Sequence, residues 1–345
     1  MTTKHPQPAD TGPADTGPTS TGPAPMPPGP ALRETHLRGL GPVHRGKVRD
    51  SYVVGDQRYL IATDRVSAFD VVFEECIPHK GRVLNQLTVY FTELARGIVP
   101  VAYESSPHPC VIVARQCPVY PLEVVVRGYL SGSAWQAYSQ GERVLSGVRL
   151  KDGLTQNDPI YPPIITPTTK AEQGHDLPIS RAELLERGLA TADEWSEIER
   201  MARALFAQGT EVAASRGLIL LDTKYEFGRG PAGPVLIDEV HTPDSSRYVR
   251  RASYEADPTH PEPLSKEFLR DWLRAQGFTG QAGVPIPHLG GEIVAALSAR
   301  YVELCRELTG REPDLTAPAD GDLEAELAGA LRSSGAPLAA GQARS

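Results

Sequence analysis

Two apolar runs in the second half of the chain each lead directly into charged residues. The first run, residues 218–221, continues into the alternating polar residues of 222–226, and the second, residues 236–237, continues into the acidic pair 238–239. Glycine and proline are concentrated in the segment 228–234 between them. Two apolar runs joined by such a segment predict a β-hairpin.

The alternation of side chains along a strand determines which of these polar groups lie together. Asp222, Lys224 and Glu226 are two residues apart, so they share one face of the first strand. If Glu226 lies opposite Leu236, then Asp238 faces Lys224 and joins the same group. A slip of one residue would turn Asp238 to the other face, so this register is a definite prediction.

Gathering carboxylates on one face requires a cation beside them. Two carboxylates about 4 Å apart repel each other by roughly 4 kcal/mol at a protein-like dielectric, and either Lys224 or a metal ion can offset this repulsion. Mg²⁺ prefers one or two protein carboxylates together with water and nucleotide phosphates. A solvated hairpin with surface ion pairs is the alternative, but the solid apolar run before Asp222 favours a buried strand. The pattern therefore favours a magnesium site at Glu226 and Asp238.

Hydrophobic spacing predicts strands and helices elsewhere in the chain. Residues 43–52 and 58–63 flank a short turn sequence and are expected to form a hairpin. Helical spacing of apolar residues predicts a helix over 83–96 and a long amphipathic helix over 192–216. Further strands are expected at 111–114 and 122–126, and further helices at 266–276 and 291–309. Because no regular βαβ repeat appears, an α+β fold is favoured over a doubly wound sheet.

Composition narrows the class of protein. The chain has 345 residues, enough for about two domains, and a net charge of -8, which gives no basic footprint for nucleic acid. It has no run of 18 apolar residues, so no membrane span is expected, and no apolar signal core near its start. The four cysteines show no CxxC pairing. A reduced, cytoplasmic compartment is therefore expected.

Three stretches carry candidate anion-binding groups. Lys47 and Arg49 are expected on one face of a strand beside Gly46, and a glycine allows close approach of a phosphate that the two cations would neutralise. A basic edge strand with no ligand is the common alternative. Neither a GxxxxGK[ST] loop nor a GxGxxG turn is present, so any nucleotide is bound in a different frame. A strand ending in Arg127 precedes a helix expected to start near Ser133, whose free N–H groups and Arg127 suit an anion. A serine N-cap with a surface arginine is the alternative there.

Other polar residues are weaker candidates. Arg247 follows two serines just beyond the acidic pair and is a second candidate phosphate ligand. Asp64 and Ser67 follow a strand, where a capping or turn role is the common alternative to lining a cleft. The polar segment 165–176 has the character of a ligand-binding loop. The candidate ligands in it are Lys170, His175 and Asp176, although an ordinary loop histidine is favoured for His175.

Together these stretches resemble the SAICAR synthetase (phosphoribosylaminoimidazole-succinocarboxamide synthase) family. The matching strings, in the family's order, are 46–50, 63–70, 121–133, 221–228 and 238–247. The resemblance covers roughly residues 40–250 and plausibly extends to about 310. It implies a two-lobed α+β fold with antiparallel sheets, flanking and C-terminal helices, and an ATP-binding lobe similar to those of kinases and ATP-grasp enzymes.

The resemblance also implies a reaction of purine biosynthesis. In it, ATP, L-aspartate and carboxyaminoimidazole ribonucleotide (CAIR) give SAICAR, ADP and phosphate through an acyl phosphate. Glu226 and Asp238 are then expected to bind Mg²⁺ and, with Lys224, to form the catalytic group. Gly46, Lys47, Arg49 and Lys224 would bind ATP. The substrate-binding residues would be Arg127, Ser133 and Arg247, with Asp64, Ser67, Lys170, His175 and Asp176 as less definite members.

Five segments are expected on this basis. Residues 1–31, which repeat a short Thr-Gly-Pro motif, form a disordered tail, and 32–120 form the nucleotide-binding lobe. Residues 121–265 form a central lobe with the magnesium and substrate sites, 266–312 form C-terminal helices, and 313–345 form a weakly ordered tail. A small-molecule kinase and a non-catalytic nucleotide-binding module are the rival functions, and the oligomeric state is left open.

Overall fold

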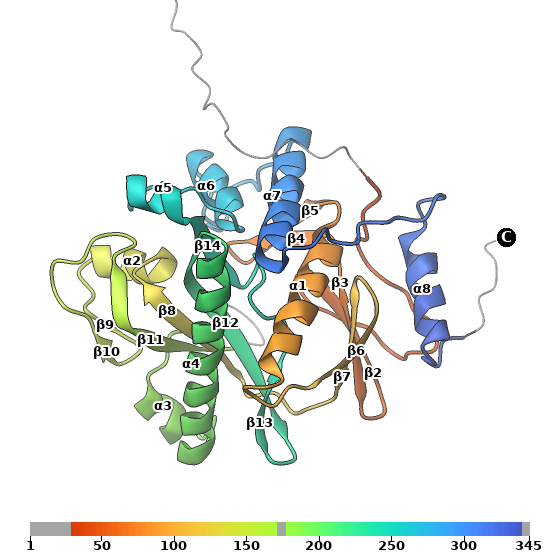
Figure 1. The fold of residues 1–345 in the computed structure, drawn as a ribbon, viewed down its shortest axis with the longest axis horizontal. Helices are drawn as coiled ribbons and strands as arrows, with labels where there is room; N and C mark the ends of the chain where they lie inside the picture. Colours follow the sequence, from red (N-terminus) through yellow and green to blue (C-terminus); the bar gives the residue numbers. More distant parts are fainter. Residues whose placement is uncertain (1–28, 171–176, 340–345) are drawn as a thin grey trace, which may run out of the picture.

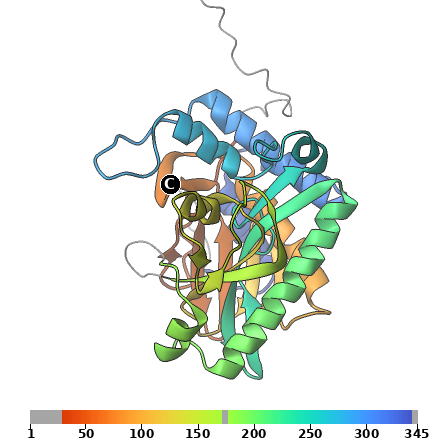
Figure 2. The same cartoon turned by 90° about the vertical axis from the view of Figure 1, so that its left-hand side faces the viewer.

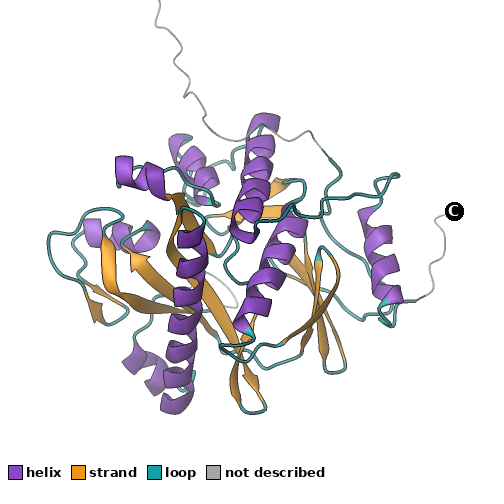
Figure 3. Ribbon diagram, viewed as in Figure 1, coloured by secondary structure: helices purple, strands orange, loops and turns teal. Residues whose placement is uncertain are grey.

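The computed structural model describes residues 29–170 and 177–339, which form two antiparallel sheets with helices around them (Figure 1; Figure 3). The first sheet has the order β1-β2-β3-β7-β6. Its strands, all paired antiparallel, are β1 (His44–Arg45), β2 (Arg49–Val54), β3 (Gln57–Ala62), β7 (Val111–Arg115) and β6 (Tyr103–His108). The glycine at Gly55 has φ of 62°, which closes the tight β2–β3 hairpin.

The second sheet has the order β11-β8-β12-β13, and β14 also pairs with β12. Its strands are β11 (Pro159–Thr169), β8 (Leu122–Tyr129), β12 (Leu218–Gly230), β13 (Gly233–Ile237) and β14 (Ser246–Arg250). Two short pairs complete the strands, β4 (Arg65–Ala68) with β5 (Val71–Cys76), and β9 (Val144–Leu145) with β10 (Val148–Arg149). The long strand β12 is the centre of this sheet, because three other strands pair along its length.

Helices cover the sheets on several sides. The longest, α4 (Ala192–Ser215), lies along β12, as Figure 1 and Figure 2 both show. It begins at a capping box of Thr191 and Glu194, and its buried stripe includes Trp195, Ile198 and Leu205. The remaining helices are α1 (Lys80–Ala95), α2 (Gly132–Ser139), α3 (Arg181–Glu186), α5 (Arg251–Ala256), α6 (Glu267–Ala275), α7 (Gly291–Thr309) and α8 (Leu323–Ser333).

Alternate residues of the first sheet face two different cores. Tyr59 and Ile61 of β3 pack with Leu327 and Leu331 of α8, which are fully buried. Leu60, between them on the strand, instead joins a cluster that includes Val235 of β13. One face of the sheet is thus covered by α8 and the other is turned toward the second sheet, as the period of two along a strand requires.

The α+β architecture and most of the elements predicted from hydrophobic spacing are confirmed, including the β12–β13 hairpin and helices α1, α4, α6 and α7. The single strand expected over 43–52 is wrong: β1 and β2 pair with each other around residues 46–48, so Lys47 lies in the connection and not on a strand beside Arg49. The expected weakly ordered tail, residues 313–345, contains α8. The first sheet falls within 32–120 and the second within 121–265, while the exact domain boundaries stay a prediction. Most of the expected tail 1–31 lies outside the described residues. None of the described helices combines the length and apolar character needed to cross a membrane.

Candidate functional site

Two neighbouring cavities collect most of the polar residues singled out in the sequence. The β2 cavity, of about 450 Å³, is lined by Gly46, Lys47, Arg49, Lys170, Glu226 and Asp238 among others. The β14 cavity, of about 260 Å³, is lined by Arg127, Ser133, Lys224, Asp244 and Arg247 among others. Glu123 of β8 lines both, so the two cavities adjoin. A third and larger cavity, of about 580 Å³, shares Arg247 with the β14 cavity but none of the predicted metal-binding carboxylates.

The hairpin brings Glu226 and Asp238 to one cavity, although its register differs from the predicted one. Glu226 pairs with Ile237, and Phe227 pairs with Leu236, so the strands are displaced by one residue from the expected alignment. Strict alternation would then turn Asp238 away. Instead β13 ends at Ile237, and Asp238 has φ of 65°, outside the strand conformation. Aspartate tolerates this left-handed region better than most residues, and the turn directs its carboxylate back into the β2 cavity.

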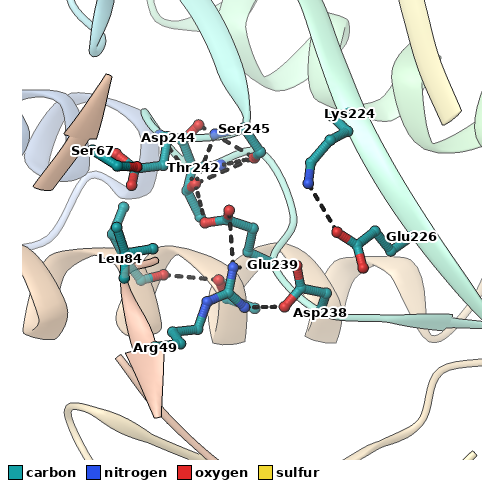
Figure 4. Close-up of polar contacts among 12 residues, drawn as sticks. Arg49, Ser67, Leu84, Lys224, Glu226, Asp238, Glu239, Thr242, Asp244 and Ser245 are labelled. Atoms are coloured by element: carbon teal, nitrogen blue, oxygen red, sulfur yellow. Dashed lines mark hydrogen bonds and ion pairs between the residues drawn. The ribbon is translucent and has the colours of Figure 1, made fainter. Parts of the chain in front are cut away.

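Arg49 of β2 binds both members of the acidic pair. Its guanidinium contacts Asp238 through two nitrogens, one of them 3.2 Å from Oδ2, and its Nη2 lies 2.9 Å from Oε1 of Glu239 (Figure 4). Burial by itself would lower the pKa of Arg49, but the two carboxylates outweigh burial and raise it. Burial dominates for Asp238 and raises the pKa of its carboxyl, against the lowering effect of Arg49. The ionised form of Asp238 therefore depends on a nearby cation.

Glu226 lies between two lysines. Lys224 Nζ is 2.8 Å from one carboxylate oxygen, and Lys170 forms an ion pair with the other. Burial favours the neutral acid, but the two ammonium groups outweigh it and lower the pKa of Glu226 to about 2. Lys224 also binds Glu123 at 2.6 Å, and these two glutamates raise the pKa of its ammonium despite burial. Glu226 and Lys224 are thus both charged at neutral pH.

The predicted phosphate clamp is assembled in the β14 cavity around a carboxylate that sequence reasoning did not assign. Arg127 donates to Ser133 Oγ at 3.3 Å and lies 3.3 Å from Asp222, while Arg247 reaches the same Asp222 at 2.8 Å. Asp222 is the cross-strand partner of both arginines, which is why it meets them. The helix expected near Ser133 begins at Gly132. A Cβ at Gly132 would lie 2.3 Å from Nη2 of Arg247, so only glycine permits this packing.

Four weaker candidates were Asp64, Ser67, Lys170 and the His175–Asp176 pair. Asp64 lines neither cavity: it is buried and accepts backbone N–H groups of Leu32 at 2.7 Å and Gly81 at 2.8 Å, the capping role given as its alternative. Burial raises the pKa of its carboxyl to about 6. Lys170 belongs to the β2 cavity, beside Glu226, and was expected with the substrate residues. His175 and Asp176 lie outside the described residues.

Ser67 leads to a buried charge cluster that local sequence patterns did not reveal. Its hydroxyl is 3.4 Å from Nζ of Lys266, which lies 3.5 Å from Asp244. Lys80 is 2.9 Å from the same carboxylate oxygen, and Tyr301 donates to the other. Burial lowers the pKa of Lys266 to about 8 despite the nearby Asp244. The members come from four separate elements, so only the fold brings them together.

The cavities suit a magnesium nucleotide. Among residues 29–170 and 177–339, no group of three or more His, Cys, Asp or Glu is placed to hold a metal ion. An ion at Glu226 and Asp238 would therefore have two protein carboxylates, and nucleotide phosphates and water would complete its shell, as Mg²⁺ prefers. Lys47, which pairs with Asp70, and Arg49 line the same cavity and would supply positive charge for phosphates beside the ion.

Comparison with known proteins gives a consistent picture. The sequence model of the SAICAR synthetase family matches residues 42–285. The phosphoribosylaminoimidazole-succinocarboxamide synthase of Bacteroides thetaiotaomicron is 48% identical over 279 residues, which is 79% of this chain and 89% of that protein. A solved SAICAR synthase from Saccharomyces cerevisiae, complexed with SAICAR, superposes with a TM-score of 0.71 at 33% identity, covering 82% of this chain and 99% of that one. A SAICAR synthetase in complex with ADP shares the fold, with a TM-score of 0.62 and 23% identity.

Proposed function

This chain belongs to the SAICAR synthetase family and is a ligase of purine biosynthesis, and we propose that it joins L-aspartate to CAIR at the expense of ATP. One observation carries this proposal: two adjoining cavities share Glu123, one with the carboxylate pair and the basic residues Lys47 and Arg49, and the other with the arginine clamp. A kinase shares the first cavity, but its acceptor need not carry a phosphate that calls for the clamp. A second anion clamp fits a phosphorylated substrate held beside the nucleotide.

ATP would occupy the β2 cavity, with its phosphates against Lys47 and Arg49. Glu226 and Asp238 would hold Mg²⁺, which when bound neutralises charge on the transferring phosphoryl group. CAIR would lie in the β14 cavity with its 5′-phosphate on Arg127, Ser133 and Arg247. For transfer to occur, the carboxylate of CAIR would have to face the wall at Glu123 that the two cavities share.

The chemistry follows from the weakness of a carboxylate as an electrophile. An oxygen of the CAIR carboxylate attacks the γ-phosphorus, the bond to the β-phosphate oxygen breaks, and ADP leaves. The amine of aspartate then attacks the acyl carbon, the amide forms, and inorganic phosphate leaves as the amine loses a proton. Lys224, held as a cation by Glu123 and Glu226, lies where negative charge gathers in both steps.

A test of the metal assignment is Asp238→Asn. Asparagine also tolerates a positive φ, so the backbone turn at this position is retained while one negative charge is lost. We expect turnover to fall by about 100-fold or more, the usual loss when a single transition-state charge partner is removed. Unchanged kinetics at saturating Mg²⁺, with a folded protein by circular dichroism, would refute the assignment of Asp238.

A test of the reaction itself is ADP release measured with each acceptor separately and together. Release that requires both CAIR and aspartate supports the ligase. Release with one acceptor alone would instead identify a kinase, and ATP binding without turnover would identify a binding module.

A further inference from the structure

A single loop connects the two cavities. It joins β13 to β14, and its first residue, Asp238, lines the β2 cavity. Its last residues, Asp244 and Ser245, line the β14 cavity, and only Ser246 separates them from Arg247 of the clamp. Two of its residues, Asp238 and His241, have positive φ values of 65° and 54°, so the loop follows a tightly specified path.

Side chains within this loop form a continuous hydrogen-bonded connection from Arg49 to the clamp side. Arg49 Nη2 lies 2.9 Å from Oε1 of Glu239, and the other oxygen of Glu239 accepts the hydroxyl of Thr242 at 2.6 Å (Figure 4). Glu239 is 8% exposed and Thr242 is fully buried. Hydrogen bonds in such a low-dielectric environment are stronger than those in water, and their partners are correspondingly hard to replace.

The hydroxyl of Thr242 has one proton, which fixes its role. Because it donates that proton to Glu239, its oxygen can act only as an acceptor toward the rest of the loop. It faces the backbone N–H groups of Asp244 and Ser245, each at 3.3 Å, and the hydroxyl of Ser245 at 3.2 Å. The carbonyl of Ser245 in turn accepts the N–H of Lys224 at 2.9 Å. The loop is thereby tied to β12 between the two cavities.

The far end of the loop is anchored by charge. Lys80 of α1 lies 2.9 Å from Asp244, Lys266 lies 3.5 Å away, and Tyr301 of α7 donates to the same carboxylate. Arg49 is divided between Asp238 and Glu239, both of which compete for it. The segment from Glu239 to Thr242 is therefore the part whose partners change when an anion or a cation enters the β2 cavity.

We propose that Glu239 and Thr242 are positioning residues that couple nucleotide binding to binding of the phosphorylated substrate. A nucleotide phosphate near Arg49 draws the guanidinium away from Glu239, and the carboxylate then depends more strongly on the Thr242 hydroxyl. A firmer bond to Thr242 orders the loop at Asp244 and Ser245, beside Arg247. Nucleotide therefore increases affinity for the substrate, and linkage requires the substrate to increase affinity for nucleotide by the same factor. The inference rests on the proposed function for the identity of both ligands.

The test measures the dissociation constant of CAIR by calorimetry, without and with saturating ADP and MgCl₂. In the wild-type protein we expect ADP to tighten CAIR binding by about tenfold, a typical coupling between sites. Thr242→Val keeps the shape of the side chain and removes the hydroxyl, and we expect the coupling factor to fall below about 2. Thr242→Ser retains the hydroxyl and should restore coupling, which a purely steric role of Thr242 would not predict.

Glu239→Gln is an independent second variant. The glutamine oxygen can still accept the Thr242 hydroxyl, which leaves its NH₂ group facing Arg49, so the competition for Arg49 is lost and coupling should fall. Because Arg49 is then held by Asp238 alone, ADP by itself should bind at least as tightly as it does to the wild-type protein, and circular dichroism checks that the variant is folded. Coupling that persists in Thr242→Val and Glu239→Gln, or a wild-type coupling factor near 1, would overturn the inference and leave the ligase assignment standing. A folded wild-type protein that binds ADP but not CAIR would refute the proposed function itself, and the coupling with it.

Discussion

Replacing Gly209 by alanine should destabilise the protein, although the same change in a helix normally stabilises it. Gly209 lies inside α4, where alanine is favoured over glycine by about 1 kcal/mol. At this position a Cβ would lie 2.3 Å from Cε1 of His241 and 2.7 Å from both of its ring nitrogens. The imidazole is fully buried among Leu205 of α4, Phe91 of α1 and Tyr225 of β12, so it has no solvent-filled space into which it can move.

The expected magnitude follows from what the imidazole must give up. Overpacking a close-packed core costs about 1–3 kcal/mol. Nε2 of His241 lies 3.2 Å from the Tyr225 hydroxyl and 3.2 Å from the carbonyl of Leu205, and breaking a buried hydrogen bond adds about 1–3 kcal/mol. After the helical gain of about 1 kcal/mol is subtracted, the net loss should be about 1–5 kcal/mol.

The assay is urea unfolding followed by circular dichroism, with a matched control in another helix. Gly329 lies inside α8, and a Cβ there would meet no atom within 4 Å, so Gly329→Ala should stabilise by up to about 1 kcal/mol. Gly209→Ala should also reduce activity, since His241 lies in the loop that joins the cavities. If both variants gain stability equally, the contact predicted between a Cβ at position 209 and His241 is refuted.

Three further predictions concern charge, the last helix and the clamp. The pKa of Glu226 falls from 4.5 to about 2 on folding, so its ionised form contributes roughly 3 kcal/mol to the free energy of unfolding above pH 4.5, and this contribution is lost as the pH falls toward 2. In Glu226→Gln the free energy of unfolding should therefore fall less steeply between pH 4.5 and 2. Parallel curves for the variant and the wild-type protein would contradict the ion-pair argument. Leu327→Ala should lower the free energy of unfolding by about 2–5 kcal/mol, whereas Leu94→Ala, at a partly exposed position, should lower it by under about 1 kcal/mol. Equal melting temperatures for the two variants would show that α8 does not stabilise the sheet. Arg127→Ala should weaken the binding of CAIR about 10–100-fold with little effect on the binding of ATP, and Lys47→Ala should do the reverse. If calorimetry finds that Arg127→Ala weakens the binding of both ligands equally, the phosphate clamp lies elsewhere.

The sequence was most informative where local patterns decide structure. Periodicity of two and of 3.6 identified the hairpin and the long helices, because each depends on neighbouring residues. It also brought Glu226 into consideration through its alternation with Asp222 and Lys224, and Arg127 because it ends a buried apolar run. The one-residue error in register shows the limit: the position of Asp238 depends on a single left-handed backbone conformation, which alternation cannot express.

Groups assembled from distant parts of the chain were less accessible to sequence reasoning. Asp244 meets Lys80, Lys266 and Tyr301 only because three helical segments converge there, and no spacing rule relates their positions. Lys170 was assigned by the polar character of its loop, which cannot tell which of two adjoining cavities it enters. Helix α8 was missed because it is short and directly precedes the Ala/Gly/Ser-rich stretch from about residue 333, and its burial comes from the sheet against which it packs.

The position of α8 has a consequence for how the protein is made. Its Leu327 and Leu331 fill one face of a sheet whose strands all lie between residues 44 and 115. During synthesis those strands leave the ribosome more than 200 residues before their covering helix, at roughly 5–20 residues per second. For some tens of seconds at the slower of those speeds, the nascent chain exposes an apolar sheet face. The earliest part of the polypeptide to emerge is thus among the last to be completed, and chaperones have that interval in which to engage it.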